Sequence, residues 1–196
     1  MKDKIYIIAL FGKSGAGKDF LKKELVKNSD IFKEVINYTT RPKRDYEENG
    51  KNYYFTDPDT FAKKILDGSM VEASVFNDWF YGTSIENLNK DKINVGVFNI
   101  NAIECLLEDE RLKVYPILIE ARNKIRLERL LKREKDPNCK EICRRFLKDE
   151  EDFLNIPFEY ETFINGREST EINFCNICTK KIKWAKENNY IDEIFI

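Results

Sequence analysis

The 196-residue sequence contains no histidine. Histidine is the usual general base beside a nucleophilic Ser or Cys, so its absence excludes Ser-His-Asp and Cys-His catalysis and removes the commonest metal ligand. The five cysteines are an odd number, which argues against a disulfide framework. The 34 basic and 35 acidic residues leave a formal net charge of −1, so no overall field attracts nucleic acid or an anionic membrane, and we expect neither as a partner. Any anion site must be built locally.

The N-terminal part of the chain has an apolar run at residues 5–11. The run is too short to span a bilayer, and no small-x-small cleavage pattern follows it. Its β-branched and aromatic residues instead predict a strand that is buried on both faces of a parallel sheet. With 42% apolar and 35% charged residues, the chain is expected to form one globular domain in the cytoplasm.

A glycine-rich turn follows this strand and fits the pattern G-x-x-x-x-G-K, with Asp where Ser or Thr is usual. The turn consists of Gly12, Lys13, Ser14, Gly15, Ala16, Gly17, Lys18 and Asp19. Apolar residues at helical spacing over 20–25 then predict a helix. The glycines let successive N–H groups point at an anion, the helix dipole adds about half a positive charge there, and Lys18 would reach the β- and γ-phosphates. The motif therefore predicts a P-loop that binds ATP, and the alternative is a turn that binds nothing.

Asp19 is the departure from the usual pattern, in which a Ser or Thr hydroxyl binds Mg²⁺. A carboxylate can also hold this hard cation, directly or through water, although it repels phosphate when the metal is absent. We therefore expect Asp19 to bind the metal, and the use of metal to differ from the common pattern.

Residues 37–55 carry a long gapped pattern of Thr-Thr-Arg-Pro-x-Arg, then Glu, Gly and Tyr-x-Phe. Pro42 keeps the chain extended between Arg41 and Arg44, whose planar forks match phosphate oxygens, and Tyr53 can add a phenolic donor. A solvated basic loop would be an equally good explanation of these residues alone. Downstream of a P-loop, however, the pattern resembles the nucleotide-monophosphate-binding segment of guanylate kinases.

Two later elements resemble the same family, a Gly-x-x-x-Glu that ends at Glu72 and the sequence Tyr-Gly-Thr-Ser at residues 81–84. The resemblance implies a GMP site made of Asn37, Arg41, Arg44, Tyr53, Glu72, Tyr81, Gly82, Thr83 and Asn99. In this family the arginines and tyrosines surround the monophosphate, while Glu72, Thr83 and the residue at position 37 face the base. Guanine offers two donors to one carboxylate, whereas adenine presents an acceptor, so a site built around Glu72 would discriminate by roughly 10⁴-fold. Asn37 replaces a family Ser and can still donate to guanine O6, but it is larger.

Residues 94–100 predict another core strand, and the family has Asp-x-Asp near the end of this strand. The present sequence has Asn99-Ile100-Asn101, so both carboxylates are gone. We hypothesise that the acid lost at the strand end is replaced by Asp19, which would restore one negative charge near Mg²⁺. The alternative is a decline towards low activity.

Residues 123–148 resemble the lid of the family, with Arg129, Arg133 and Arg145 at the positions that close over the triphosphate. Arg144 is an alternative to Arg145. The resemblance implies that the catalytic residues are Lys18, Arg41, Arg129, Arg133 and Arg145. The arginines would neutralise charge on the transferring phosphoryl group, and lid closure would exclude water. The alternative is a solvent-exposed helical face whose charged side chains form i, i+4 ion pairs and bind no nucleotide.

Residues 158–166 resemble the last core strand, whose Asn lies near the adenine of ATP in the family. Asn165 is thus a candidate for the ATP site, although Asn-Gly is equally a turn signal. Ser169 or Thr170 can cap a final helix that runs to about residue 188.

Four of the cysteines form two close pairs, Cys139 with Cys143 and Cys175 with Cys178. Four thiolates could hold zinc. The second pair, however, shares an apolar helical stripe, so we expect it to pack in the core.

We expect an α/β fold of the P-loop NTPase type, with a parallel sheet flanked by helices. Its core would comprise residues 1–35, 89–122 and 149–196, with a monophosphate-binding insertion at 36–88 and a lid at 123–148. The resemblance implies transfer of the γ-phosphoryl group of ATP to GMP or dGMP with Mg²⁺, by a monomer or homodimer. Two alternatives stay open, a kinase of another (deoxy)nucleotide or a sugar phosphate, and a guanylate-kinase-like binding module of weak activity.

Overall fold

The computed structural model describes residues 4–44, 47–76, 78–133, 135–166 and 170–187. Within them, five strands form an all-parallel sheet in the order β2-β7-β1-β8-β9. The strands are β1 (Ile5–Phe11), β2 (Phe32–Glu34), β7 (Ile93–Val97), β8 (Leu112–Glu120) and β9 (Glu161–Ile164). The predicted parallel sheet is therefore confirmed.

The central strand β1 is buried on both faces, as its continuous apolar run predicts. Ile8 and Leu10 belong to one core cluster, whereas Ile7 and Phe11 belong to another on the opposite face. This alternation follows from the period of two along a strand. The sheet therefore has a separate hydrophobic core on each side.

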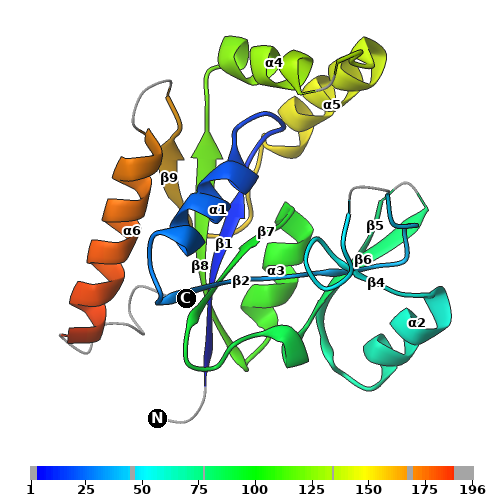
Figure 1. Cartoon of the computed structure of the whole chain (residues 1–196), viewed down its shortest axis with the longest axis vertical. Coiled ribbons are helices and arrows are strands. Elements are labelled where there is room, and N and C mark those ends of the chain that lie inside the picture. Colours follow the sequence, from blue (N-terminus) through cyan, green and yellow to red (C-terminus); the bar gives the residue numbers. More distant parts are fainter. Residues whose placement is uncertain (1–3, 45–46, 77, 134, 167–169, 188–196) are drawn as a thin grey trace.

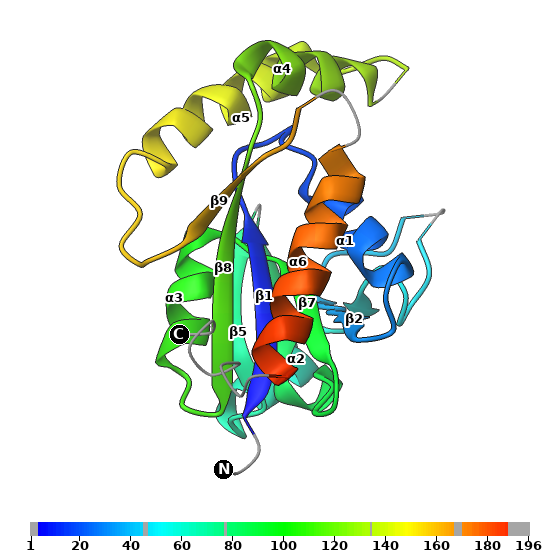
Figure 2. The same ribbon diagram turned by 90° about the vertical axis from the view of Figure 1, so that its left-hand side faces the viewer.

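Helices cover both faces of the sheet (Figures 1 and 2). On one face lie α1 (Lys18–Lys27) and α6 (Thr170–Glu187), and on the other lies α3 (Ile100–Glu108). Cys175 and Cys178 of α6 are buried in the core beside α1, as predicted. Ser169, the alternative cap of this helix, lies outside the described residues.

A second sheet of four strands lies beside the first, in the order β4-β3-β6-β5 (Figure 1). Its elements are β3 (Tyr38–Thr39), β4 (Tyr54–Phe55), β5 (Met70–Phe76) and β6 (Trp79–Ser84), together with α2 (Pro58–Leu66) and the 3-10 turn η1 (Ile85–Asn87). Asp57 caps α2 by accepting a hydrogen bond from the Thr60 backbone N–H at 2.8 Å, with Pro58 in the first turn.

Two helices, α4 (Asn123–Lys132) and α5 (Cys139–Asp152), lie beyond the end of β8 at one end of the molecule (Figure 1). Helix α5 continues through residue 148, where the sequence suggests the end of the lid, and four further residues belong to it. Among the described residues, no helix is long and apolar enough to cross a membrane.

One predicted strand is too long. The apolar pattern over 94–100 suggests a strand to Ile100, but β7 ends at Val97 and α3 begins at Ile100. The side chain of Asn99 accepts a hydrogen bond from the Ala102 backbone N–H at 2.7 Å, so Asn99 caps α3 and ends the extended segment. Because β1 and β7 are parallel neighbours, their carboxyl ends place Gly12 and Asn99 at one edge of the sheet, where α/β proteins bind ligands.

Candidate active site

The turn after β1 has the backbone that an anion cradle requires. Gly12, Gly15 and Gly17 have φ angles of 142°, 78° and 94°, which side-chain-bearing residues rarely adopt. A Cβ atom on Gly15 would also lie 2.6 Å from the Arg126 carbonyl oxygen. The three glycines therefore allow the loop to curl, and Gly15 also allows its close approach to α4.

Lys18 starts α1 and folds back over this turn. Its Nζ donates hydrogen bonds to the Gly12 carbonyl at 2.7 Å and the Lys13 carbonyl at 3.2 Å. Burial lowers the pKa of the Lys18 ammonium, and the carboxylates of Asp19 and Asp149 oppose that shift. Phosphate oxygens at this position would likewise favour the charged ammonium.

A pocket of about 240 Å³ opens over the turn between α1 and the two lid helices. It is lined by Ser14, Gly15, Gly17, Lys18, Asp19, Phe20, Arg129, Leu130, Arg133 and Arg145. The structure thus brings the three lid arginines named from the sequence together with the P-loop. Both Arg144 and Arg145 pair with Glu141, at 2.7 Å and 2.6 Å, but only Arg145 lines this pocket, so the lining favours Arg145.

Two residues predicted for the ATP site, Lys13 and Asn165, do not line the pocket over the P-loop. The Lys13 side chain pairs with Glu150 at 2.5 Å and lines another pocket, so only its backbone faces Lys18. Asn165 is buried and donates through Nδ2 to the Ala16 carbonyl at 2.7 Å. This hydrogen bond holds the backbone of the P-loop at Ala16. Contact of Asn165 with the base of ATP stays a prediction.

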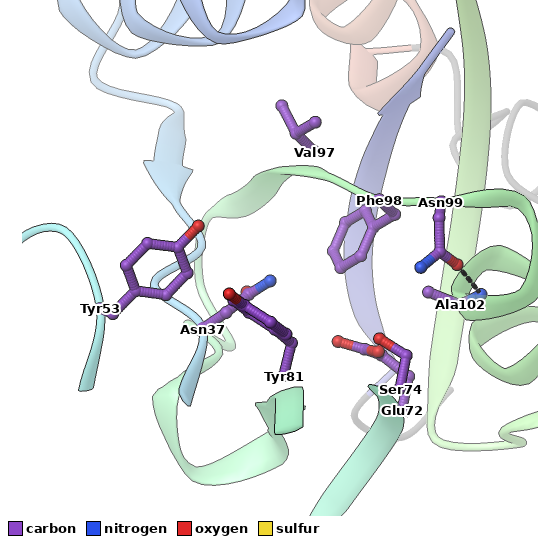
Figure 3. Close-up of a pocket in the computed structure, with 9 residues that line it drawn as sticks. All are labelled: Asn37, Tyr53, Glu72, Ser74, Tyr81, Val97, Phe98, Asn99 and Ala102. Atoms are coloured by element: carbon purple, nitrogen blue, oxygen red, sulfur yellow. Dashed lines mark hydrogen bonds between the residues drawn. The ribbon is translucent and has the colours of Figure 1, made fainter. Parts of the chain in front are cut away.

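A second pocket, of about 220 Å³, lies between the second sheet and the end of β7 (Figure 3). Its lining consists of Asn37, Tyr53, Glu72, Ser74, Tyr81, Val97, Phe98, Asn99 and Ala102. Five of these were named for the GMP site from the sequence. Segments that are far apart in the chain therefore form one polar cavity.

Glu72 lies at the base of this pocket and is 6% exposed. The Thr83 hydroxyl donates to Glu72 Oε1 at 2.6 Å and lies 3.2 Å from Asn37 Oδ1. Burial raises the pKa of Glu72 to about 7, and the hydrogen bond from Thr83 opposes the shift. A buried carboxyl group with one described donor has acceptor capacity left for two ligand N–H groups.

Gly82 does not line the pocket but permits its shape. It lies on β6 opposite Ala73 of β5, and a Cβ atom there would meet the Glu72 carbonyl oxygen at 2.7 Å. A side chain would therefore push β5 and β6 apart, and with them Glu72 and Thr83.

Arg41 and Arg44 lie in the loop between β3 and β4, where Glu47 binds both. Arg41 Nη2 pairs with Glu47 Oε1 at 2.7 Å, and the Arg44 backbone N–H donates to Glu47 Oε2 at 2.9 Å. The Arg41 guanidinium also lies 5.6 Å from the centre of the Tyr53 ring. Glu47 is 6% exposed, and its hydrogen bond with Arg41 lowers its pKa. Glu47 therefore orients Arg41. The Glu belongs to the sequence motif, but the motif alone did not indicate this role.

Asn99 presents its two ends to different partners. Its Oδ1 atom caps α3, and Figure 3 shows its amide nitrogen on the pocket side. The pocket thus receives a hydrogen-bond donor at this position instead of a carboxylate oxygen.

Ser74 is a lining residue that the sequence analysis missed. It lies two residues after Glu72 on β5, and both side chains point into the pocket in Figure 3. The period of two along a strand places residues i and i+2 on one face, and this signal could have identified it.

Asp19 offers one exposed carboxylate beside Lys18 in the first turn of α1. Mg²⁺ commonly uses one or two protein carboxylates together with substrate phosphates and water, and this donor set fits that requirement. The part of the chain that the structure describes holds no group of three or more His, Cys, Asp or Glu side chains placed to bind a metal ion.

Comparisons with known proteins agree with this geometry. The family model described as "Guanylate kinase" matches residues 3–173. The guanylate kinase of Legionella pneumophila (strain Lens) is 31% identical over 163 residues, covering 80% of this chain and 76% of that protein. A guanylate kinase from Sus scrofa is 44% identical over 78 residues, 39% of each chain. Among solved structures, the guanylate kinase from Anaplasma phagocytophilum superposes with a TM-score of 0.62 and 19% identity, covering 93% of this chain and 87% of that one, which shows a shared fold.

Proposed function

Because the chain belongs to the guanylate kinase family, we propose that it transfers the γ-phosphoryl group of ATP to GMP or dGMP, giving ADP and GDP or dGDP. The observation that carries this proposal is the buried carboxyl of Glu72, held by Thr83 at the base of a pocket that shares one sheet edge with the P-loop. A second nucleotide bound there would direct its phosphate toward the ATP site.

Base selection follows from the donors and acceptors of the pocket. Guanine N1–H and N2–H₂ would donate to the Glu72 carboxylate, while the amide N–H of Asn37 would donate to O6. Adenine has an acceptor at N1, so it would leave the buried carboxylate unpaired. This mismatch disfavours adenine by roughly 10⁴-fold.

The chemistry needs no covalent nucleophile, which agrees with the absence of histidine. Arg41, oriented by Glu47, and the two pocket tyrosines would hold the GMP phosphate so that its oxygen attacks the γ-phosphorus in line. Lys18 and the P-loop amides would bind the β- and γ-phosphates, and the lid arginines would neutralise the charge that develops between the two nucleotides. Asp19 would hold Mg²⁺, which when bound would offset the negative charge of the phosphates.

The test is ADP release with Mg·ATP against a panel of ribo- and deoxynucleoside monophosphates. We expect turnover confined to GMP and dGMP, and a decrease in kcat of about 10²–10³-fold for Lys18→Ala, with GMP binding unchanged. Turnover of other bases would replace the proposal with a broader nucleotide kinase. GMP binding without turnover would leave a binding module. Cytoplasmic location and a monomeric or homodimeric state stay predictions.

A further inference from the structure

Arg126 is a charged side chain that the reaction outlined above does not use. It lies on α4 and is 1% exposed. Its Nε donates to the Ser14 carbonyl at 2.9 Å, and its Nη2 pairs with Asp149 Oδ2 at 2.7 Å. Its guanidinium carbon also lies 4.2 Å from the centre of the Phe146 ring. One buried cation therefore joins the P-loop, α4 and α5.

Asp149 of α5 completes the link from the other side. Its Oδ2 atom accepts from the Ser14 backbone N–H at 2.6 Å, and its Oδ1 atom lies 3.3 Å from the Ser14 hydroxyl. Both backbone groups of Ser14 are thus held, the N–H by the carboxylate and the carbonyl by the guanidinium. We call Ser14, Arg126 and Asp149 the clasp.

The clasp lies one helical turn from a lid arginine. Asp149 and Arg145 are four residues apart on α5, so they share a face of that helix. Arg145 lines the pocket over the P-loop together with Lys18. Anchoring Asp149 to the P-loop therefore determines where Arg145 can lie.

Stability alone explains this arrangement poorly. A buried ion pair is seldom more stabilising than apolar side chains of similar volume, because desolvation offsets the attraction between the charges. Its directional hydrogen bonds instead select one arrangement of the groups that they join. Here those groups are a phosphate-binding loop and a lid helix.

We propose that Arg126 and Asp149 are positioning residues for phosphoryl transfer, which hold Ser14 in the cradle conformation and Arg145 over the bound triphosphate. The proposal rests on the kinase function proposed above. It assigns these two residues a role in the use of ATP and none in the binding of GMP, whose pocket lies between the second sheet and the end of β7 and is lined by neither residue.

The test compares three variants with the unmodified protein. Arg126→Met/Asp149→Leu removes the clasp but keeps apolar volume, and Asp149→Asn removes only the charge. Glu151→Gln is the matched control, because Glu151 lies on the same helix, is 70% exposed and pairs with Lys148. The measurements are kcat/KM for ATP, KM for GMP, the thermal midpoint and hydrogen exchange of the Ser14 amide.

We expect kcat/KM for ATP to decrease by about 100-fold in the double variant and about 10-fold in Asp149→Asn, because displaced catalytic groups lower the rate this strongly. The GMP KM should change by less than about twofold, and the control should match the unmodified protein. Ser14 should exchange faster in both clasp variants, since its N–H loses a charged acceptor. A folded double variant with kcat/KM within about threefold of the unmodified protein would show a purely structural pair and overturn the proposal.

Two further outcomes are decided by the same data. If the double variant does not fold, Asp149→Asn decides, and unchanged kinetics with unchanged Ser14 exchange overturn the clasp. If the unmodified protein shows no kinase turnover, the proposed function fails by itself. Calorimetric affinity for Mg·ATP then replaces kcat/KM, and equal affinities in Asp149→Asn and the unmodified protein reject the positioning role.

Discussion

The ionisation of Glu72 should determine how well the protein uses GMP. In the free protein this carboxyl is buried and its pKa is raised to about 7, chiefly by desolvation. Only the ionised form can accept both guanine donors. Lowering the pH through 7 should therefore weaken the use of GMP, and restoring it should recover the activity.

The magnitude follows from the fraction of Glu72 that is ionised. With a pKa of about 7, roughly nine-tenths is ionised at pH 8 and one-tenth at pH 6, so kcat/KM for GMP should decrease about tenfold. Replacing the carboxylate by the amide of Glu72→Gln puts donor against donor, and we expect a decrease of about 10³-fold at pH 8.

The assay is kcat/KM for GMP between pH 6 and 8 at saturating Mg·ATP. The phosphate of GMP itself titrates near pH 6, as phosphate monoesters do, so Glu72→Gln serves as the reference profile. Its amide does not ionise, and dividing the two profiles isolates Glu72. Parallel profiles for the two proteins would refute the assignment of Glu72 as the base reader.

The same shift makes Glu72 unfavourable for folding at alkaline pH. A folded-state pKa raised from 4.5 to about 7 gives stability that is complete below pH 4.5 and lost as the pH rises through 7, an effect of about 3 kcal/mol. Glu72→Gln should therefore be more stable than the unmodified protein at pH 8, with the difference shrinking at pH 5. Urea unfolding at the two pH values measures this, and equal free energies of unfolding at pH 8 would contradict it.

Two further substitutions test other parts of the site. Glu47→Gln should raise the KM for GMP about tenfold with little effect on the KM for ATP, because Arg41 loses the charged partner that orients it. Equal changes in both KM values in steady-state kinetics would contradict this role. A double-mutant cycle on Asp19→Ser and Asn99→Asp tests whether Asp19 replaces a missing strand-end acid. We expect coupling between the two sites, and strictly additive effects on turnover would remove the idea.

The β1 strand and the P-loop were predictable because their signals are local. A run of seven apolar residues has few stable places other than the centre of a parallel sheet, and its two faces enter separate cores as expected. The glycines of the turn adopt φ angles that other residues avoid, so their positions in the sequence indicate the shape of the backbone there. Such features need no knowledge of the distant chain.

The end of β7 was not predictable from apolarity. Phe98 and Ile100 continue the apolar pattern, and the chain leaves the sheet because Asn99 binds the backbone three residues ahead. At this residue the side-chain cap of α3 competes with continuation of β7. An apolar pattern carries no information about such a cap, so it does not predict where the strand ends.

The clasp was hidden for a different reason. Arg126 and Arg129 of α4 and Arg133 directly after it recur at helical spacing, and the sequence gives no ground for distinguishing the buried arginine from its neighbours. Asp149 likewise belongs to a run of four acidic residues, on a helix whose sequence predicts exposure to solvent. What selects Arg126 and Asp149 is the position of Ser14, more than 100 residues away in the chain from both. A charge becomes a positioning group only when the fold brings a backbone peptide to it, so contacts of this kind have to be read from the structure.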